Sequence, residues 1–179
     1  MLKMEQTCLL IVDVQGKLAN LMHEKELLFD NLQKLIKGIQ VLEVPILWVE
    51  QNPGGLGPTV PEIADHITGV TPISKMSFDS CRNQQFVAAL KQLDRKQVLI
   101  AGIETHICVY QTAAGLVDMG VEVQVVADAV ASRRPENKAL GLQKMRDVGA
   151  GLTSVETALF ELLQVADGDK FKNVLRIVK

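Results

Sequence analysis

The chain has 179 residues, and its 19 lysine and arginine side chains nearly balance its 21 aspartate and glutamate side chains. This length suits one domain, spanning residues 1–179, with a substantial core. The balanced charge excludes a strongly basic surface for nucleic acid or anionic membrane, so we expect a small-molecule substrate as the partner.

Short apolar runs bounded by turn signals alternate with amphipathic patterns along the chain. Their continuous apolar character predicts strands covered on both faces, at 8–13, 45–49, 97–101, 121–127 and 151–155. Periodicity predicts helices at 24–42, 82–93, 106–119, 135–148 and 156–163. Residues 71–75 fit either an extra edge strand or an extended loop, and 51–61 form an irregular connection. The alternation predicts an α/β fold with a parallel sheet and helices on both faces.

The three cysteines, Cys8, Cys81 and Cys108, are widely spaced and include no CxxC pair. An odd set of this kind disfavours both a disulfide framework and a structural zinc site, and it indicates a reducing compartment. The first residues lack a secretory-leader pattern, and no apolar run approaches the about 18 residues of a membrane span. We therefore expect a cytoplasmic protein.

Three chemically capable residues fall where expected strands end, namely Asp13, Lys75 and Cys108. Ligands of open parallel sheets bind beyond the carboxyl ends of the strands, so these three side chains would face one crevice. Each also has an ordinary interpretation. A strand-end aspartate often forms a turn, a lone lysine is usually solvated, and a lone cysteine is often a small core residue, as we expect for Cys8.

The position of Cys108 differs from that of Cys8. Thr105 is a candidate N-cap, which would put Cys108 at the third position of a helix, where free backbone N–H groups and the helix dipole stabilise a thiolate. Such a position lowers a cysteine pKa from about 8.5 to roughly 3.5–7.5, particularly beside a lysine. The sequence therefore predicts an activated nucleophile at Cys108.

Five motifs, in their order and spacing, resemble the isochorismatase-like cysteine hydrolase family over nearly the whole chain. They are LLIVDVQ at 9–15, SKMSFDS at 74–80, VLIAGIETHICVYQTAAGLVDMG at 98–120, VQVVADAVASR at 123–133 and SVETALFELL at 154–163. The GxExHxCV form of the nucleophile turn is most similar to the small isochorismatase-domain subgroup, which is related to nicotinamidases and N-carbamoylsarcosine amidohydrolases.

This resemblance implies a Rossmann-like three-layer α/β/α sandwich with a mostly parallel, six-stranded sheet. It implies a catalytic triad of Asp13, Lys75 and Cys108, and a cis peptide bond between Ile103 and Glu104. The backbone N–H groups of Glu104 and Cys108 would then form an oxyanion hole. Members of the family commonly assemble as homo-oligomers, dimers or larger, so we expect one here.

The resemblance also implies a reaction. We expect hydrolysis of a small amide or related C–N substrate through a thioester at Cys108, with Asp13 as the acid and base. Two alternatives stay open. One is metal-free cleavage of a vinyl ether, as in true isochorismatases, with Asp13 as the acid; the other is a non-catalytic, oligomeric binding protein that keeps the fold.

Nicotinamidases carry an Asp-x-His metal motif after the second strand, and this chain has Glu50, Gln51 and Asn52 there. One carboxylate with two amides is a poor set of ligands for a transition metal, so we expect no metal and no other cofactor. Leu18 stands where those enzymes have an aromatic residue five positions after the catalytic aspartate. We keep it as a substrate-contact candidate.

Three further residues are candidates for substrate contact. Gln15 would lie on the same side of an extended segment as Asp13 and could bind the substrate, Asp13 or the turn. Trp48 and Phe78 could form pocket walls, although apolar residues near strand ends are as often plain core. The roles of His106 and Cys81, which flank the expected site, stay open.

Overall fold

The computed structural model, which describes residues 1–179, contains one sheet of six parallel strands. Its strands are β1 (Thr7–Val12), β2 (Ile46–Gln51), β3 (Ile73–Lys75), β4 (Gln97–Ile103), β5 (Glu122–Ala131) and β6 (Gly151–Thr153). Their order in the sheet is β3-β2-β1-β4-β5-β6. After β1 the chain builds outward to β3 and then returns to the other side of β1, so the strand order reverses between β1 and β4. This is the position at which open α/β sheets bind ligands.

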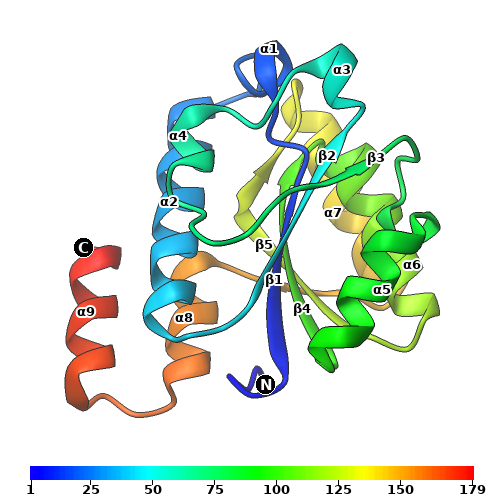
Figure 1. The fold of residues 1–179 in the computed structure, drawn as a ribbon. Coiled ribbons are helices and arrows are strands. Elements are labelled where there is room, and N and C mark those ends of the chain that lie inside the picture. The colour runs from blue at the N-terminus through cyan, green and yellow to red at the C-terminus, as the bar shows by residue number, and fades with distance from the viewer.

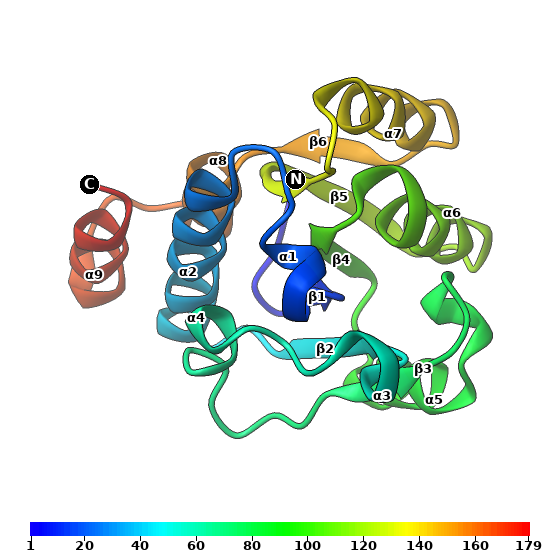
Figure 2. The same cartoon turned by 90° about the horizontal axis from the view of Figure 1, so that it is seen from above.

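Helices cover both faces of the sheet and form the outer two of three layers (Figures 1 and 2). On one face lie α2 (Lys25–Val41), α4 (Pro61–Ala64), α8 (Val155–Leu163) and α9 (Gly168–Val178). On the other face lie α5 (Gln84–Leu93), α6 (Tyr110–Asp118) and α7 (Pro135–Asp147). Two short helices, α1 (Gly16–Ala19) and α3 (Pro53–Leu56), lie beyond the carboxyl ends of β1 and β2. The predicted three-layer α/β/α fold is confirmed.

The two faces of the sheet bury separate apolar cores because side chains alternate along each strand. In β1, Leu9 and Ile11 pack toward α2 and α8, whereas Cys8, Leu10 and Val12 pack toward α5 and α6. All six residues of β1 are buried, which explains the unbroken apolar run that follows Thr7. The two cores therefore hold the central strand β1 from both faces of the sheet.

In three segments the structure either settles a choice that the sequence left open or contains an element that the sequence analysis did not predict. Residues 71–75 include the edge strand β3, which pairs with β2. The irregular connection at 51–61 contains α3 and is joined to the turn after β1 by a bridge between Gln15 and Thr59. Helix α9 was not expected; it packs against α2 and α8 through Val174 and its neighbours. None of the helices combines the length and the apolar character required to cross a membrane.

Candidate active site

Asp13 and Lys75 form a buried ion pair beyond the carboxyl ends of β1 and β3. Lys75 Nζ lies 2.7 Å from Asp13 Oδ2, and the two side chains are 0% and 4% exposed. Asp13 follows β1 directly and has a left-handed backbone, with φ of 52°, which is uncommon for a residue other than glycine. Lys75 is therefore not a solvated surface charge, which is the usual position of a lone lysine.

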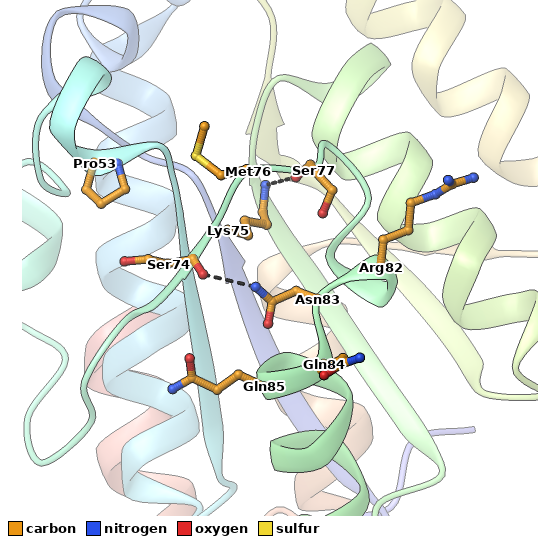
Figure 3. A pocket seen from close by; sticks show the side chains of 9 residues that line it. All are labelled: Pro53, Ser74, Lys75, Met76, Ser77, Arg82, Asn83, Gln84 and Gln85. Carbon is orange, nitrogen blue, oxygen red and sulfur yellow. Dashed lines mark hydrogen bonds between the residues drawn. The ribbon is translucent and has the colours of Figure 1, made fainter.

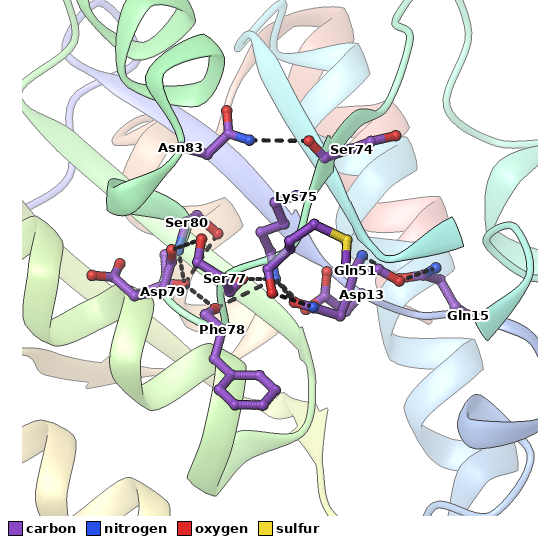
Figure 4. Close-up of polar contacts among 12 residues, drawn as sticks. Asp13, Gln15, Gln51, Ser74, Lys75, Ser77, Phe78, Asp79, Ser80 and Asn83 are labelled. Atoms are coloured by element: carbon purple, nitrogen blue, oxygen red, sulfur yellow. Dashed lines mark hydrogen bonds and ion pairs between the residues drawn. The ribbon is translucent and has the colours of Figure 1, made fainter. Parts of the chain in front are cut away.

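Lys75 also contacts three further oxygens (Figure 4). Its Nζ donates to Gln51 Oε1 at 3.0 Å and to the carbonyl oxygens of Ser77 and Phe78 at 3.2 and 3.3 Å. The Gln51 amide donates from its other end to the carbonyl oxygen of Met76 at 2.8 Å. Gln51 thus connects the ammonium group to the backbone of the loop after β3, a role that sequence reasoning missed.

Gln15 holds the loop after β2 against the turn after β1. Its Nε2 donates to the carbonyl oxygens of Gln51 and Gly57 at 3.0 and 2.7 Å, and its Oε1 accepts from the Gln51 N–H at 2.7 Å. The side chain is fully buried. Of the roles considered for Gln15, the structure therefore shows the one that stabilises the turn.

Near its end, β4 packs tightly against β1 at Gly102, just before the turn that carries Cys108. Gly102 pairs with Val12 and has φ of 121°; a Cβ atom at this position would stand 2.1 Å from the Val12 carbonyl oxygen. Only glycine fits this approach. The peptide bond between Ile103 and Glu104 is cis, and the chain then enters the turn that carries Cys108.

The helix after β4 begins differently from the predicted N-cap geometry. A π-helical turn, η2 (Thr105–Val109), precedes α6, and Val109 N–H donates to the Glu104 carbonyl oxygen at 3.3 Å. Glu104 occupies the N-cap position without a side-chain capping bond, and the buried Thr105 Oγ1 has no hydrogen-bond partner. The expectation of a Thr105 cap was wrong, because the extra residue of the π turn shifts the start of the helix.

The acidity of Cys108 is also opposite to the expectation. Burial is the largest of the effects that raise the pKa of its thiol to about 12; the carboxylates of Asp13 and Glu104 add to it, and Lys75 opposes it in part. The pKa-lowering effect expected from the helix start is smaller than the pKa-raising effect of burial and nearby negative charge. Cys108 therefore carries a proton at neutral pH and requires a base.

Asp13 is suited to be that base. Burial raises the pKa of its carboxyl group, and the Lys75 ammonium opposes this by lowering it. The Cys108 thiol also lowers the Asp13 pKa through its proximity, although Asp13 Oδ1 makes no hydrogen bond of standard geometry. A raised carboxyl pKa makes the carboxylate a stronger base, which reduces the difference in acidity from the thiol.

The remaining candidates lie in different surroundings. Trp48 and Leu18 pack into the apolar core on the α2 face, whereas Cys108 belongs to the core on the opposite face. Trp48 Nε1 donates to Thr59 Oγ1 at 2.9 Å. Phe78 is half-exposed, and its carbonyl oxygen accepts from Lys75. Of these three residues, only Phe78 lies in the exposed loop that follows Lys75.

A groove of about 530 Å³ borders the site along the edge strand β3 (Figure 3). Lys75, Ser77, Arg82 and Gln84 are among its lining residues. Neither Asp13 nor Cys108 lines the groove, so it adjoins the triad on its Lys75 side.

The residues at the expected position of a metal motif have structural contacts instead. Glu50 is buried, and its Oε1 accepts from both the N–H and the hydroxyl of Thr59, at 2.7 and 2.8 Å. Gln51 is bound to Lys75. The chain has no group of three or more histidine, cysteine, aspartate or glutamate side chains that could hold a metal ion.

Comparisons with known proteins show the family to which this chain belongs. A family model described as the isochorismatase domain matches residues 7–157. Isochorismatase domain-containing protein 2A of Mus musculus is 36% identical over 180 residues, which cover 98% of this chain and 84% of that protein.

Solved structures superpose over nearly the whole chain. MAR1 ribonuclease from Caenorhabditis elegans gives a TM-score of 0.92 at 32% identity, covering 99% of this chain and 91% of that one. YcaC from Escherichia coli, an octameric hydrolase of unknown specificity, gives 0.93 at 25% identity, with coverages of 98% and 88%. YcaC from Pseudomonas aeruginosa, solved with hexane-2,5-diol and covalent acrylamide, gives 0.92 at 25% identity, with coverages of 98% and 90%.

Proposed function

Because the chain belongs to the isochorismatase family and has the fold of its hydrolases, we propose that it hydrolyses a small amide or related C–N substrate through a thioester at Cys108. The observation that carries this proposal is the meeting of three groups with complementary roles. A protonated thiol lies beside a buried carboxylate, and an ammonium group 2.7 Å from that carboxylate holds it in place. The covalent acrylamide in the Pseudomonas aeruginosa relative is a further support for a nucleophile, since it shows that a protein of this fold forms a covalent bond with a small electrophile.

In the first half-reaction the thiol proton of Cys108 passes to the Asp13 carboxylate while sulfur attacks the substrate carbonyl carbon. A C–S bond forms, and the carbonyl π electrons move onto oxygen. The backbone N–H groups of Glu104 and Cys108 would hold this oxyanion, and one such donor typically contributes about 10²–10³ in rate. When the oxyanion collapses the C–N bond breaks, and Asp13 gives its proton to the departing ammonia or amine.

In the second half-reaction the Asp13 carboxylate takes a proton from water, and the oxygen attacks the thioester carbon. The C–S bond breaks, the carboxylic acid leaves, and Asp13 returns the proton to the Cys108 sulfur. Lys75, paired with Asp13, stabilises the ionised form of that carboxyl group. Asp13 thus serves as acid and base in both half-reactions, and the cycle ends with the Cys108 thiol protonated again.

We extend the proposal to the assembly of the protein, its location and one wall of its substrate pocket. We propose a homo-oligomer, since the related YcaC of Escherichia coli is octameric. We also propose a reducing, cytoplasmic location, because all three cysteines are free. Phe78, half-exposed in the loop after Lys75, is the side chain that we propose as a wall for the substrate.

The test is to trap the thioester. The protein is incubated with a panel of small primary amides, quenched in acid within milliseconds to seconds, and its intact mass is measured alongside ammonia release. We expect an added acyl mass that peptide mapping assigns to Cys108, together with ammonia. Undiminished ammonia release by C108S would exclude the covalent route; cleavage of vinyl ethers alone would favour Asp13 acting as an acid without the thiol.

A further inference from the structure

Glu104 carries a buried carboxylate that no step of the proposed reaction uses. Its side chain is 4% exposed, while that of its partner Arg133 is 54% exposed. Arg133 Nε lies 2.8 Å from Glu104 Oε1, and the Arg133 backbone N–H donates to Oε2 at 3.4 Å. Because Arg133 follows β5, this pair joins the segment beyond β4 to the segment beyond β5.

His106 and Ser132 complete a small polar cluster around the same carboxylate. His106 Nδ1 lies 3.0 Å from Ser132 Oγ and 3.7 Å from Glu104 Oε2. Serine, histidine and an acid are the residue types of a nucleophilic triad, but a triad requires the two ring nitrogens to serve the two partners separately. Here one nitrogen faces both, and Ser132 is fully buried. The cluster is therefore unsuited to be a second nucleophilic site.

The backbone of Glu104 is part of the turn that carries the nucleophile. Its carbonyl oxygen accepts from the N–H groups of Ile107 and Val109 at 3.0 and 3.3 Å, on either side of Cys108 in sequence. One residue therefore holds this turn through its carbonyl oxygen and is itself held by Arg133 through its side chain. A displacement of the Glu104 side chain would move the start of the turn with it.

We propose that the Glu104–Arg133 ion pair is a positioning device that fixes the nucleophile turn against β5 and balances the negative charge beside Cys108. The proposal rests on the proposed function in that it gives this turn the task of presenting Cys108. Neither side chain takes or gives a proton in the reaction. The side chains of Glu104 and Arg133 thus have a positioning role, which is separate from the oxyanion contact proposed above for the Glu104 backbone N–H.

The charges around the thiol give this role a signature that packing alone would not produce. Asp13, Lys75 and Glu104 act on the Cys108 thiol, and Arg133 and His106 face Glu104. Glu104 raises the thiol pKa, so removing its charge should lower the pH at which Cys108 ionises. Removing Arg133 leaves the Glu104 charge without its ion pair and should raise that pH.

The experiment compares E104Q, R133M, R133K and the double variant E104Q/R133M with R134M. Arg134 is a matched control, since it is the next residue, is exposed and makes no ion pair or hydrogen bond through its side chain. The rate at which iodoacetamide modifies Cys108 is measured between about pH 8 and pH 11.5 by peptide mass spectrometry. Thermal unfolding of each variant identifies any that fails to fold.

We expect the alkylation profile of E104Q to move to lower pH and that of R133M to higher pH, each by roughly half a unit or more. The double variant should return toward the wild-type profile, R133K should lie between wild type and R133M, and R134M should match wild type. Shifts of E104Q and R133M in the same direction, or no shift in either, would overturn the proposal. E104Q and R133K keep the size and much of the polarity of the native residues, so they test it even if R133M unfolds.

Turnover provides the second measurement once an amide substrate is found. Because small misplacements of a reacting group cost about 10²-fold, we expect R133M to lower kcat by roughly 10- to 100-fold with little change in KM. R134M should stay within about twofold of wild type. The alkylation shifts do not depend on any substrate, so a failure to find amide hydrolysis would contradict the proposed function without affecting this result. Equal kcat in R133M and R134M would contradict the positioning role.

Discussion

The two halves of the site are held together in different ways. The Asp13–Lys75 half depends on buried charge, with one ammonium group shared among a carboxylate, an amide and two carbonyl oxygens. The Cys108 half depends on backbone proximity: Gly102 lies against Val12, and the turn is held at Glu104. The difference indicates that breaking the charged pair of the first half will cost stability as well as activity, whereas removing the thiol of the second half will affect activity alone.

The largest expected effect follows from removing the thiol alone. C108A keeps the backbone of the turn and the Asp13–Lys75 pair, so the protein should stay folded while turnover falls by at least about 10³-fold. Ammonia release by the purified variant measures this. The control is C81A, which removes a half-buried thiol outside the triad and should keep turnover within about twofold. Turnover of C108A near the wild-type level would mean that the second half holds no nucleophile.

The next effect concerns the first half. K75M leaves Asp13 buried without its partner, and breaking such a pair costs about 3–5 kcal/mol. Urea unfolding measures the loss in free energy of unfolding, and turnover should also disappear. The matched control is K170M: the Lys170–Glu43 pair has the same 2.7 Å separation, but its side chains are 45% and 79% exposed.

We expect no resolvable change of stability in K170M, because water and salt screen exposed pairs. If K75M and K170M unfold at the same urea concentration, buried charge does not hold the first half together, and the contrast between the two halves fails.

A smaller effect tests the packing of the second half. A Cβ atom on Gly141 of α7 would lie 2.8 Å from the backbone of Thr105 and His106, so α7 approaches the nucleophile turn closely. G141A should cost about 1–3 kcal/mol and lower turnover by displacing this turn. G54A is the control, because the nearest atom to its added Cβ is 4.0 Å away. Equal stability and turnover in the two variants would show that the turn is not held by α7.

The smallest expected effect is a pH dependence of kcat/KM, which tests the roles of Asp13 and Cys108 as base and acid. Asp13 must be ionised to accept the thiol proton, and burial raises its pKa, so kcat/KM should fall as the pH drops through a value above the about 3.9 of an ordinary aspartate. At the other end, the rate should not follow a free thiolate with a pKa in the neutral range, because the thiol ionises only near pH 12. A pH profile of kcat/KM between pH 4 and pH 9 measures both. A kcat/KM that does not fall as the pH drops to about 4 would exclude Asp13 as the buried base.

Much of the fold could be predicted because strands buried on both faces leave unbroken apolar runs in the sequence. The edge strand β3 left no such pattern, since it has three residues and two of them are polar. Helix α9 is a different case, because Phe171, Val174, Leu175 and Val178 recur at the i, i+3, i+4, i+7 spacing of an amphipathic helix, so the sequence does carry its signal. A short edge strand such as β3 depends on contacts that are distant in sequence, and a local pattern does not record them.

The site was predictable in its residues but not in its environment. The strand-end positions of Asp13, Lys75 and Cys108 identified the group that meets in space. Burial depth could not be read from position, so the acidity of the thiol was predicted with the wrong sign. Trp48 shows a related limit: both faces of its strand are apolar, so the sequence does not reveal which face the side chain takes.

The burial of Lys75 makes this residue a reporter of its own surroundings. Its ammonium group has no exposed area, so an amine-modifying reagent can reach it only after the loop after β3 opens or the whole chain unfolds. The labelling rate of Lys75, divided by that of an exposed lysine such as Lys170, would therefore measure how often the native protein opens at this point. A substrate that closes the site should slow this labelling while leaving that of Lys170 unchanged.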